Sequence, residues 1–307
     1  MSSPTGPASG LPVRMPRPRQ PGRHRRPEPL AAPEGAPALV LAVPGTPSAA
    51  TRSLAEELVS IARSELPGLD ARIGYLDGDD TEFPTLQSVL ARASEERVAR
   101  FEQARAAGVD AVEPDGPVAV VVPLLAGPDH ALLRRVRQAV MDSRVAAELT
   151  DVLGPHPLLA EALHVRLSEA GLARADRARL FTVATAADGI ILASVGGDEA
   201  VQAAGITGML LAARLAVPVM AAALDEEGAI AATAEQLRTS GSQQLALAPY
   251  LIGPELDPGL LDEAAKEAGC SAAEALGSYP AIGKLALAKY TTALGIAPQQ
   301  PQGAPVR

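Results

Sequence analysis

One histidine and its charged neighbours are the residues of this sequence best suited to chemistry. Asp129 and His130 close the segment 123–130 (PLLAGPDH), which directly follows the β-branched run 118–122. A neutral imidazole can bind a divalent metal or accept a proton near neutral pH, and a carboxylate supplies an oxygen ligand. These residues predict a weak, open metal or acid–base site at His130, with Asp129 as an oxygen ligand. The alternative is a hydrogen-bonded surface or capping histidine.

Charged residues extend this candidate site. Asp77 follows a predicted strand and provides a second carboxylate. Arg134, Arg135 and Arg137 lie on the first turns of the helix predicted to start near the histidine. Guanidinium groups form paired hydrogen bonds with carboxylates, so these arginines suit an acidic ligand.

The two later histidines have structural interpretations. His156 precedes Pro157, which suits the first position of a helix, so this histidine is predicted to cap that helix or lie in its turn. His164 lies in the middle of the same predicted helix, near Glu161 and Ser168, and is predicted to be a helix-surface residue. No histidine follows His164, so the second half of the sequence offers no imidazole.

Composition disfavours several classes of function. Beyond residue 36 the chain keeps 21 of its 27 basic and 34 of its 36 acidic residues, a net charge near −13 that disfavours nucleic-acid binding. No stretch approaches the roughly 20 apolar residues of a membrane helix. A single cysteine, Cys270, excludes an internal disulfide and fits a cytoplasmic protein. Phosphate-loop, dinucleotide and nucleophile-elbow motifs are absent, so no organic cofactor is predicted.

Two pairs of similar segments indicate an internal duplication. The segment 154–159 (GPHPLL) returns 123 residues later as 277–282 (GSYPAI). The segment 122–129 (VPLLAGPD) returns 126 residues later as 248–255 (APYLIGPE). Two nearly equal offsets predict two copies of one structural unit, with a ligand between them.

Each copy alternates strand-like and helical patterns. The apolar runs 38–43 (ALVLAV) and 189–194 (GIILAS) open the two copies, and a short strand is predicted around 148–153. Alternation of this kind predicts an α/β protein with parallel sheets flanked by helices. Ligands then bind beyond the carboxyl ends of the strands, where the candidate site lies.

The predicted domain boundaries follow from these patterns. Residues 37–172 form the first half and residues 178–295 the second. The basic, proline-rich segment 1–36 and the segment 296–307 are predicted to be disordered tails. The first copy is about 25 residues longer than the second, and the extra residues, within 81–116, are predicted to form a polar external insertion.

The order of elements, the duplication and the loops PLLxGxxH and GxHP together resemble the class II tetrapyrrole chelatases, which are the sirohydrochlorin cobalt and iron chelatases. The resemblance covers roughly residues 37–295. It implies two tandem flavodoxin-like halves that face each other across a cleft, in which histidines on strand-end loops bind a divalent metal and help to insert it into the macrocycle. It also implies that His130 is the second metal histidine, and that Asp77 occupies the position of a family glutamate.

The sequence departs from this family at the first metal histidine. Where the family has a His-Gly-Ser triplet after the first strand, this chain has Pro44, Gly45 and Thr46. In the second copy, Leu256 stands opposite His130. One imidazole would therefore have to serve both as metal ligand and as proton acceptor.

The resemblance implies insertion of Co²⁺, Fe²⁺ or Ni²⁺ into sirohydrochlorin, as in cobalamin or siroheme biosynthesis. His130 would act as ligand or base with help from Asp77 and Asp129, while Arg134 and Arg135 would hold the propionates. The metal would be a substrate, and a cytoplasmic monomer would suffice, with no nucleic-acid or membrane partner.

Two alternatives stay open. A degenerate homologue would bind the tetrapyrrole or the metal without inserting it, since Pro44 replaces a metal ligand. A structural or partner-binding protein would keep only the fold, with the insertion 81–116 and the basic tail as contact surfaces.

Overall fold

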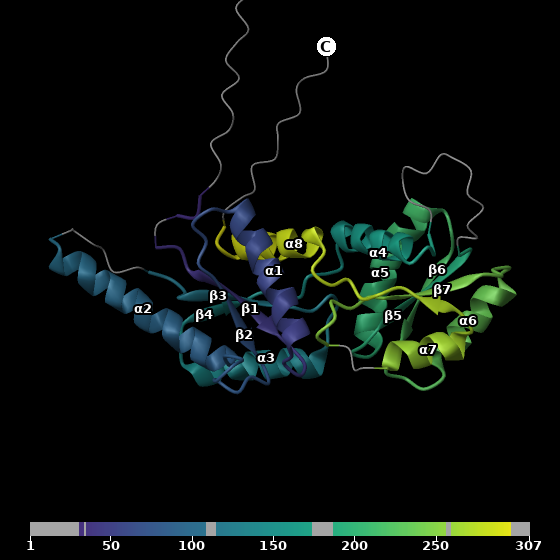
Figure 1. Cartoon of the computed structure of the whole chain (residues 1–307), viewed down its shortest axis with the longest axis horizontal. Coiled ribbons are helices and arrows are strands. Elements are labelled where there is room, and N and C mark those ends of the chain that lie inside the picture. The colour runs from purple at the N-terminus through teal and green to yellow at the C-terminus, as the bar shows by residue number, and fades with distance from the viewer. Residues whose placement is uncertain (1–30, 34, 109–114, 174–186, 256–258, 296–307) are drawn as a thin grey trace, which may run out of the picture.

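Two four-stranded parallel sheets form the framework of the molecule and lie one beside the other along its long axis (Figure 1). The computed structural model describes residues 31–33, 35–108, 115–173, 187–255 and 259–295. The strands of the first sheet are β1 (Ala38–Val43), β2 (Ala71–Tyr75), β3 (Ala119–Pro123) and β4 (Ala147–Leu149). Those of the second sheet are β5 (Gly189–Ser194), β6 (Val219–Ala223), β7 (Leu245–Pro249) and β8 (Ser271–Ala272).

Both sheets have the same strand order, β2-β1-β3-β4 and β6-β5-β7-β8, with every pairing parallel. The central strands β1, β3, β5 and β7 are buried at every position, because helices cover both faces of each sheet. This arrangement confirms the predicted fold class of two tandem α/β halves with flavodoxin-like order.

Eight helices are described, four from each half of the sequence. They are α1 (Ala49–Glu65), α2 (Leu86–Ala106), α3 (His130–Ser143), α4 (Pro157–Glu169), α5 (Asp198–Leu215), α6 (Ala229–Thr239), α7 (Leu260–Ala268) and α8 (Pro280–Ala293). Local sequence explains several starts: Ser48 and Thr51 form a capping box at α1, and Thr85 caps α2. No helix in the described part of the chain has the length and apolar character needed to cross a bilayer.

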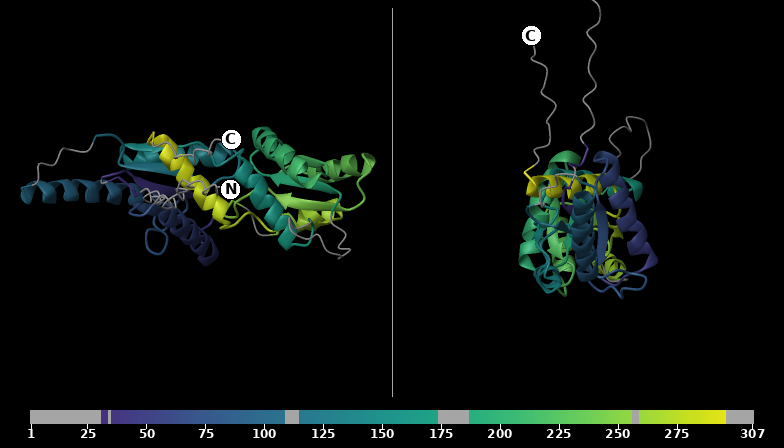
Figure 2. Two further views of the ribbon diagram at one scale, coloured as in Figure 1. Left: turned by 90° about the horizontal axis from the view of Figure 1, so that it is seen from above. Right: turned by 90° about the vertical axis from the view of Figure 1, so that its left-hand side faces the viewer.

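The last helix of each half packs on the sheet of the other half. Helix α8 contacts α1, β1 and β3, and α4 contacts α5 and β7. Figure 2 shows α8 lying over the first sheet when the molecule is seen from above. The hydroxyl of Tyr290, on α8, donates to the carbonyl of Pro37 at 2.7 Å. The predicted ranges 37–172 and 178–295 therefore divide the sequence, while each packing unit takes one helix from the other range.

His164 lies at this exchange between halves. Its side chain is only 4% exposed, and Nε of Arg214, on α5, donates to its Nδ1 at 2.7 Å. The prediction of a helix-surface residue was therefore wrong. Helix α4 packs on α5 from the other half, so the face of α4 that carries His164 is an internal contact.

The insertion 81–116 is only partly external. Leu86 and Leu90, on the first turns of α2, are fully buried against the first sheet. The later turns of α2 run past the edge of the sheet (Figure 1). The prediction of a polar external segment was thus wrong for the start of α2, and residues 109–114 lie outside the described part. The predicted tails also fall almost wholly outside the described residues.

The strand-end loops of the two halves are in direct contact. A Cβ atom on Gly45, after β1, would lie 1.9 Å from the carbonyl oxygen of Pro254, after β7. A Cβ atom on Gly196, after β5, would lie 2.8 Å from the carbonyl oxygen of Pro128, after β3. Both glycines have positive φ angles, which other residues adopt at a cost. The carboxyl ends of the two sheets therefore meet loop to loop.

Candidate functional site

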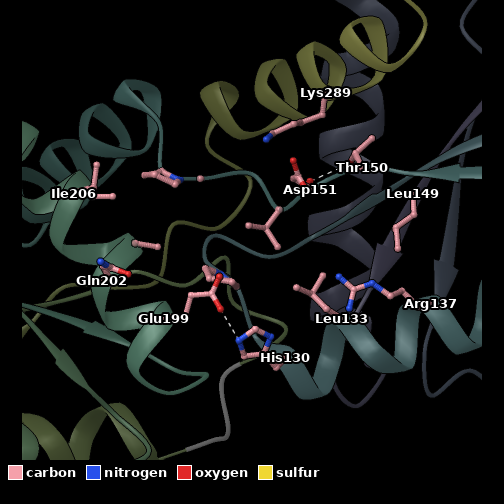
Figure 3. A pocket seen from close by; sticks show the side chains of 15 residues that line it. His130, Leu133, Arg137, Leu149, Thr150, Asp151, Glu199, Gln202, Ile206 and Lys289 are labelled. Carbon is pink, nitrogen blue, oxygen red and sulfur yellow. Dashed lines mark hydrogen bonds and ion pairs between the residues drawn. The ribbon is translucent and has the colours of Figure 1, made fainter.

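A pocket of about 610 Å³ lies at the junction of the two halves. Figure 3 shows it between α3, the loop from β4 to α4, α5 and α8. Its charged and polar lining comprises His130, Arg137, Thr150, Asp151, Glu199, Gln202 and Lys289, and its apolar lining includes Leu133, Leu149, Val152 and Ile206. The volume falls within the range of small-molecule sites.

His130 and Glu199 meet at the edge of this pocket, one from each half. Nε2 of His130 lies 2.5 Å from Oε2 of Glu199, and both side chains are more than half exposed. His130 is the first residue of α3 and Glu199 lies in the first turn of α5, so both follow strand ends. A carboxylate is favoured at a helix N-terminus by the peptide dipoles. The pair offers one nitrogen and one carboxylate to the solvent-filled side of the pocket.

Helical spacing explains which side chains reach the pocket. On α3, His130, Leu133 and Arg137 are three and seven residues apart and share one face. On α5, Glu199 and Ile206 are likewise seven residues apart. Two helices from different halves therefore present matching faces to one volume.

Two cations enter the pocket from separate elements. Arg137 comes from α3 and Lys289 from α8, and neither forms an ion pair with another described residue. Burial, and then the positive charge of Lys289, lower the pKa of His156. The carboxylate of Asp151 lines the same volume.

The structure places the other predicted site residues outside the pocket or in local roles. The carboxylate of Asp129 caps α3 by accepting from the N–H of Leu132 at 2.9 Å. Asp77 and Arg135 form an ion pair with each other, and neither side chain lines the pocket. Arg134 is exposed and does not line the pocket.

His156 has the role that its sequence predicts. Its Nδ1 accepts from the N–H of Leu158 at 3.1 Å, at the N-terminus of α4, and Pro157 occupies the first helical position. The prediction of a capping residue is confirmed.

The predicted strand around 148–153 is shorter, ending at Leu149. Beyond it, the N–H groups of Leu153 and Gly154 donate to the carbonyls of Leu125 and Ala126. This segment is therefore a loop laid along the end of β3, and it lines the pocket.

Pro44, where the resemblance predicts the loss of a metal histidine, lies in a closed position. Pro44 is buried, and the next residue, Gly45, touches Pro254 of the other half. Pro44 does not line the pocket. The predicted counterpart of His130 in the second copy, Leu256, lies outside the described residues.

Metal binding would rest on few protein ligands. Within the described residues, no three or more His, Cys, Asp or Glu side chains are grouped as metal ligands. The donor set at the pocket edge is the imidazole of His130 and the carboxylate of Glu199. Such a pair fits a divalent ion that is held transiently with other ligands from solvent or substrate.

Sequence patterns alone did not single out Glu199 or Lys289. Glu199 follows the loop after β5, a position at which the sequence predicts ligand binding, but its partner is 69 residues away in the chain. Lys289 lies on α8, which the sequence assigns to the second half, whereas its neighbours in the pocket come from both halves. Lys289 reaches the pocket because α8 packs on the sheet of the first half.

Glu255 is an unusual carboxyl group at the contact between the halves. It is the counterpart of Asp129 in the repeat, and its oxygens accept from the N–H groups of Ile252 and Gly253 at 2.6 and 2.9 Å. Burial, with a smaller effect from the charge of Asp129, raises the pKa of Glu255 to about 7 in spite of these hydrogen bonds.

This pKa predicts a pH dependence of stability. The ordinary value is 4.5, so between about pH 4.5 and 7 the folded state binds more protons than the unfolded state. The contribution of Glu255 to the free energy of unfolding should therefore fall as pH rises through this window and level off above it. Urea unfolding at several pH values should show this decline in the wild type, and Glu255→Gln should reduce it. The exposed Glu267→Gln is the control, and equal slopes in all three proteins would contradict the assignment.

Parallel sheets that meet at their strand ends, with helices exchanged between them, give this chain a chelatase-like α/β fold. The solved structures with this architecture include the sirohydrochlorin chelatase SirB from Bacillus subtilis subspecies spizizenii in complex with cobalt, at a TM-score of 0.56 and 13% identity, covering 85% of this chain and 97% of that chain. SirB from Bacillus subtilis with Fe³⁺ matches at a TM-score of 0.54 and 13% identity, covering 83% and 94%.

A third similar structure is DR2241 from Deinococcus radiodurans, a multi-domain protein with structural similarity to chelatases. It matches at a TM-score of 0.51 and 17% identity, over 83% of this chain and 55% of that chain. No family model matches the chain, and no curated protein sequence matches it. These comparisons establish the fold.

Proposed function

We propose that this protein binds a tetrapyrrole in the pocket between its halves and inserts a divalent metal, Co²⁺, Fe²⁺ or Ni²⁺, into sirohydrochlorin. The observation that carries the proposal is the His130–Glu199 pair, at 2.5 Å, on the edge of a pocket of about 610 Å³. The likeness to SirB supports it, since one of those structures holds cobalt. The metal is a substrate, and no organic cofactor takes part.

The pair suits the proton balance of this reaction. Metal insertion releases two pyrrole N–H protons as the ring nitrogens bind the ion. His130 accepts one proton or holds the incoming metal, and Glu199 supplies the second acceptor, the role that the family resemblance implied for Asp77. Because both side chains are more than half exposed, protons and hydrated metal reach them directly from solvent.

A single chain provides both walls of the pocket, so a monomer suffices for the reaction. We place the protein in the cytoplasm, in siroheme or cobalamin-type biosynthesis, and expect neither nucleic-acid nor membrane partners. The excess of acidic residues supports the exclusion of nucleic acid.

A second candidate function is tetrapyrrole binding without turnover. Pro44 favours it, because this position carries the first metal histidine in the family that the sequence resembles. Here Pro44 is buried, and the next residue, Gly45, contacts the second half. A single imidazole would then retain the ligand but not complete the exchange of metal for protons.

One experiment separates the two functions. Purified protein is mixed with sirohydrochlorin, first alone and then with Co²⁺, and the visible absorbance is followed against a sample without protein. Insertion predicts a spectral shift on binding and then a rate above the uncatalysed one. Binding without acceleration would favour the carrier, and absence of both signals would refute the proposal.

A further inference from the structure

Neither cation of the pocket forms an ion pair within the described part of the chain, although each has a neighbour on the same helix that does. On α3, Arg135 pairs with Asp77, whereas Arg137 forms no ion pair with a described residue. On α8, Lys284 pairs with Glu65 at 3.1 Å, whereas Lys289 points into the pocket (Figure 3). The chain has 36 acidic and 27 basic residues, so two cations that line one volume and pair with no described carboxylate suggest an anionic occupant.

The surface between these cations is apolar. Leu133, one turn before Arg137 on α3, lines the pocket with Leu149, and Ile206 forms the wall on α5. Ile206 is 43% exposed, and its exposed neighbours Met209 and Leu210 continue this apolar face along α5. A ligand that fits these walls has an apolar body and carboxylates at its rim.

Charge also sets the orientation of such a ligand. Figure 3 shows Glu199 and His130 on one side of the pocket, with Arg137 and Lys289 on other sides. Carboxylates are repelled by Glu199 and by Asp151 and attracted by the two cations. The ring centre is then left facing the His130–Glu199 pair.

We propose that Arg137 and Lys289 bind carboxylates on the rim of one macrocycle, so that the site selects polycarboxylate tetrapyrroles over rings with few or no carboxylates. This inference rests on the proposed function, since it assigns the specificity of the same pocket. It replaces the predicted pair Arg134 and Arg135, one exposed outside the pocket and the other bound to Asp77.

The test is a binding titration that needs no turnover. The probe is metal-free uroporphyrin, an octacarboxylate ring, compared with coproporphyrin, a tetracarboxylate ring, and followed by quenching of porphyrin fluorescence. The wild type should bind the octacarboxylate more tightly, and added salt should weaken this binding. Arg137→Gln and Lys289→Gln should each lower the affinity for uroporphyrin about tenfold, as expected for a lost charged hydrogen bond.

Matched controls carry the same change of charge elsewhere. Lys284→Gln alters the surface pair on α8, and Arg105→Gln alters the last turn of α2, so both should bind uroporphyrin within about twofold of the wild type. Circular dichroism checks that every variant is folded. Any of three results would overturn the inference. The affinity could stay unchanged in Arg137→Gln and Lys289→Gln, the controls could lose as much affinity, or the loss could be confined to Arg134→Gln.

The outcome is separable from that of the proposed function. Loss of uroporphyrin binding in the Arg137 and Lys289 variants, in a protein that inserts no metal, would support carboxylate binding by these two residues. It would refute the proposed metal insertion. If Arg137→Gln and Lys289→Gln insert metal at the full rate and keep the affinity for the ring, carboxylate binding by these residues is refuted and the proposed metal insertion is supported. A wild type that binds neither porphyrin would refute the assigned carboxylate binding, while the proposed metal insertion is decided by the sirohydrochlorin assay alone.

Discussion

Replacing His130 with alanine should slow Co²⁺ insertion into sirohydrochlorin about hundredfold or more, because positioned acid–base groups contribute factors of this size. The affinity for the metal-free ring should change little, since the apolar walls and the cations of the pocket remain. His130 is 63% exposed at its side chain and packs into no core, so the fold should tolerate the change. Initial rates from visible absorbance, at equal ring occupancy, measure the effect.

The partner carboxylate provides a matched comparison. Glu199→Gln keeps the size of the side chain and removes the second acceptor, so its rate should also fall. Asp198→Asn alters the adjacent exposed residue of α5, which does not line the pocket, and should leave the rate unchanged. Equal rates in the wild type and His130→Ala would remove the histidine from the mechanism.

Gly45→Ala should be the most destabilising single substitution at the contact between the halves. The residue has a φ of 77°, and an added Cβ would lie 1.9 Å from the backbone oxygen of Pro254, so two loops must separate. We expect the free energy of unfolding to fall by about 3 kcal/mol or more, the range of severe packing defects. Urea unfolding followed by circular dichroism measures the loss.

Gly228→Ala isolates the backbone part of this cost. Gly228 also has a φ of 77°, but an added Cβ there meets no atom within 4 Å. Its loss should therefore be about 1 kcal/mol, the cost of a left-handed conformation alone. Similar losses in the two variants would show that the loops of the two halves do not pack as described.

The sheets of this protein were predictable because their signals are local. Continuous apolar runs such as 38–43 and 189–194 identify strands buried on both faces, and the repeat fixes their common order. Capping by His156 was predictable for the same reason, since its partner is two residues away.

The exchange of α4 and α8 left no local signal. A repeat reveals which segments resemble each other, but not the sheet on which each one packs. The interpretation of His164 failed for this reason, because its partner Arg214 is 50 residues away on another element. The same long-range packing brings Lys289 beside residues of both halves.

The candidate site was predictable only at its histidine. The position of His130 after a strand follows from the loop motif, and the structure places it on the pocket edge. The carboxylate of Asp129 instead caps α3, and that of Asp77 pairs with an arginine. Sequence spacing does not show which of several possible contacts a side chain makes. Glu199 comes from the other half and meets His130 only through the packing of the two halves, which no local pattern predicts.

A crystal structure of the protein with cobalt-loaded sirohydrochlorin tests the central claim most directly. We expect the ring in the pocket between α3, α5 and α8, with the metal about 2 to 2.5 Å from Nε2 of His130 or from the carboxylate of Glu199. The rim carboxylates should lie on Arg137 and Lys289. A ring bound on another surface, or a pocket that stays empty at saturating ligand, would contradict it.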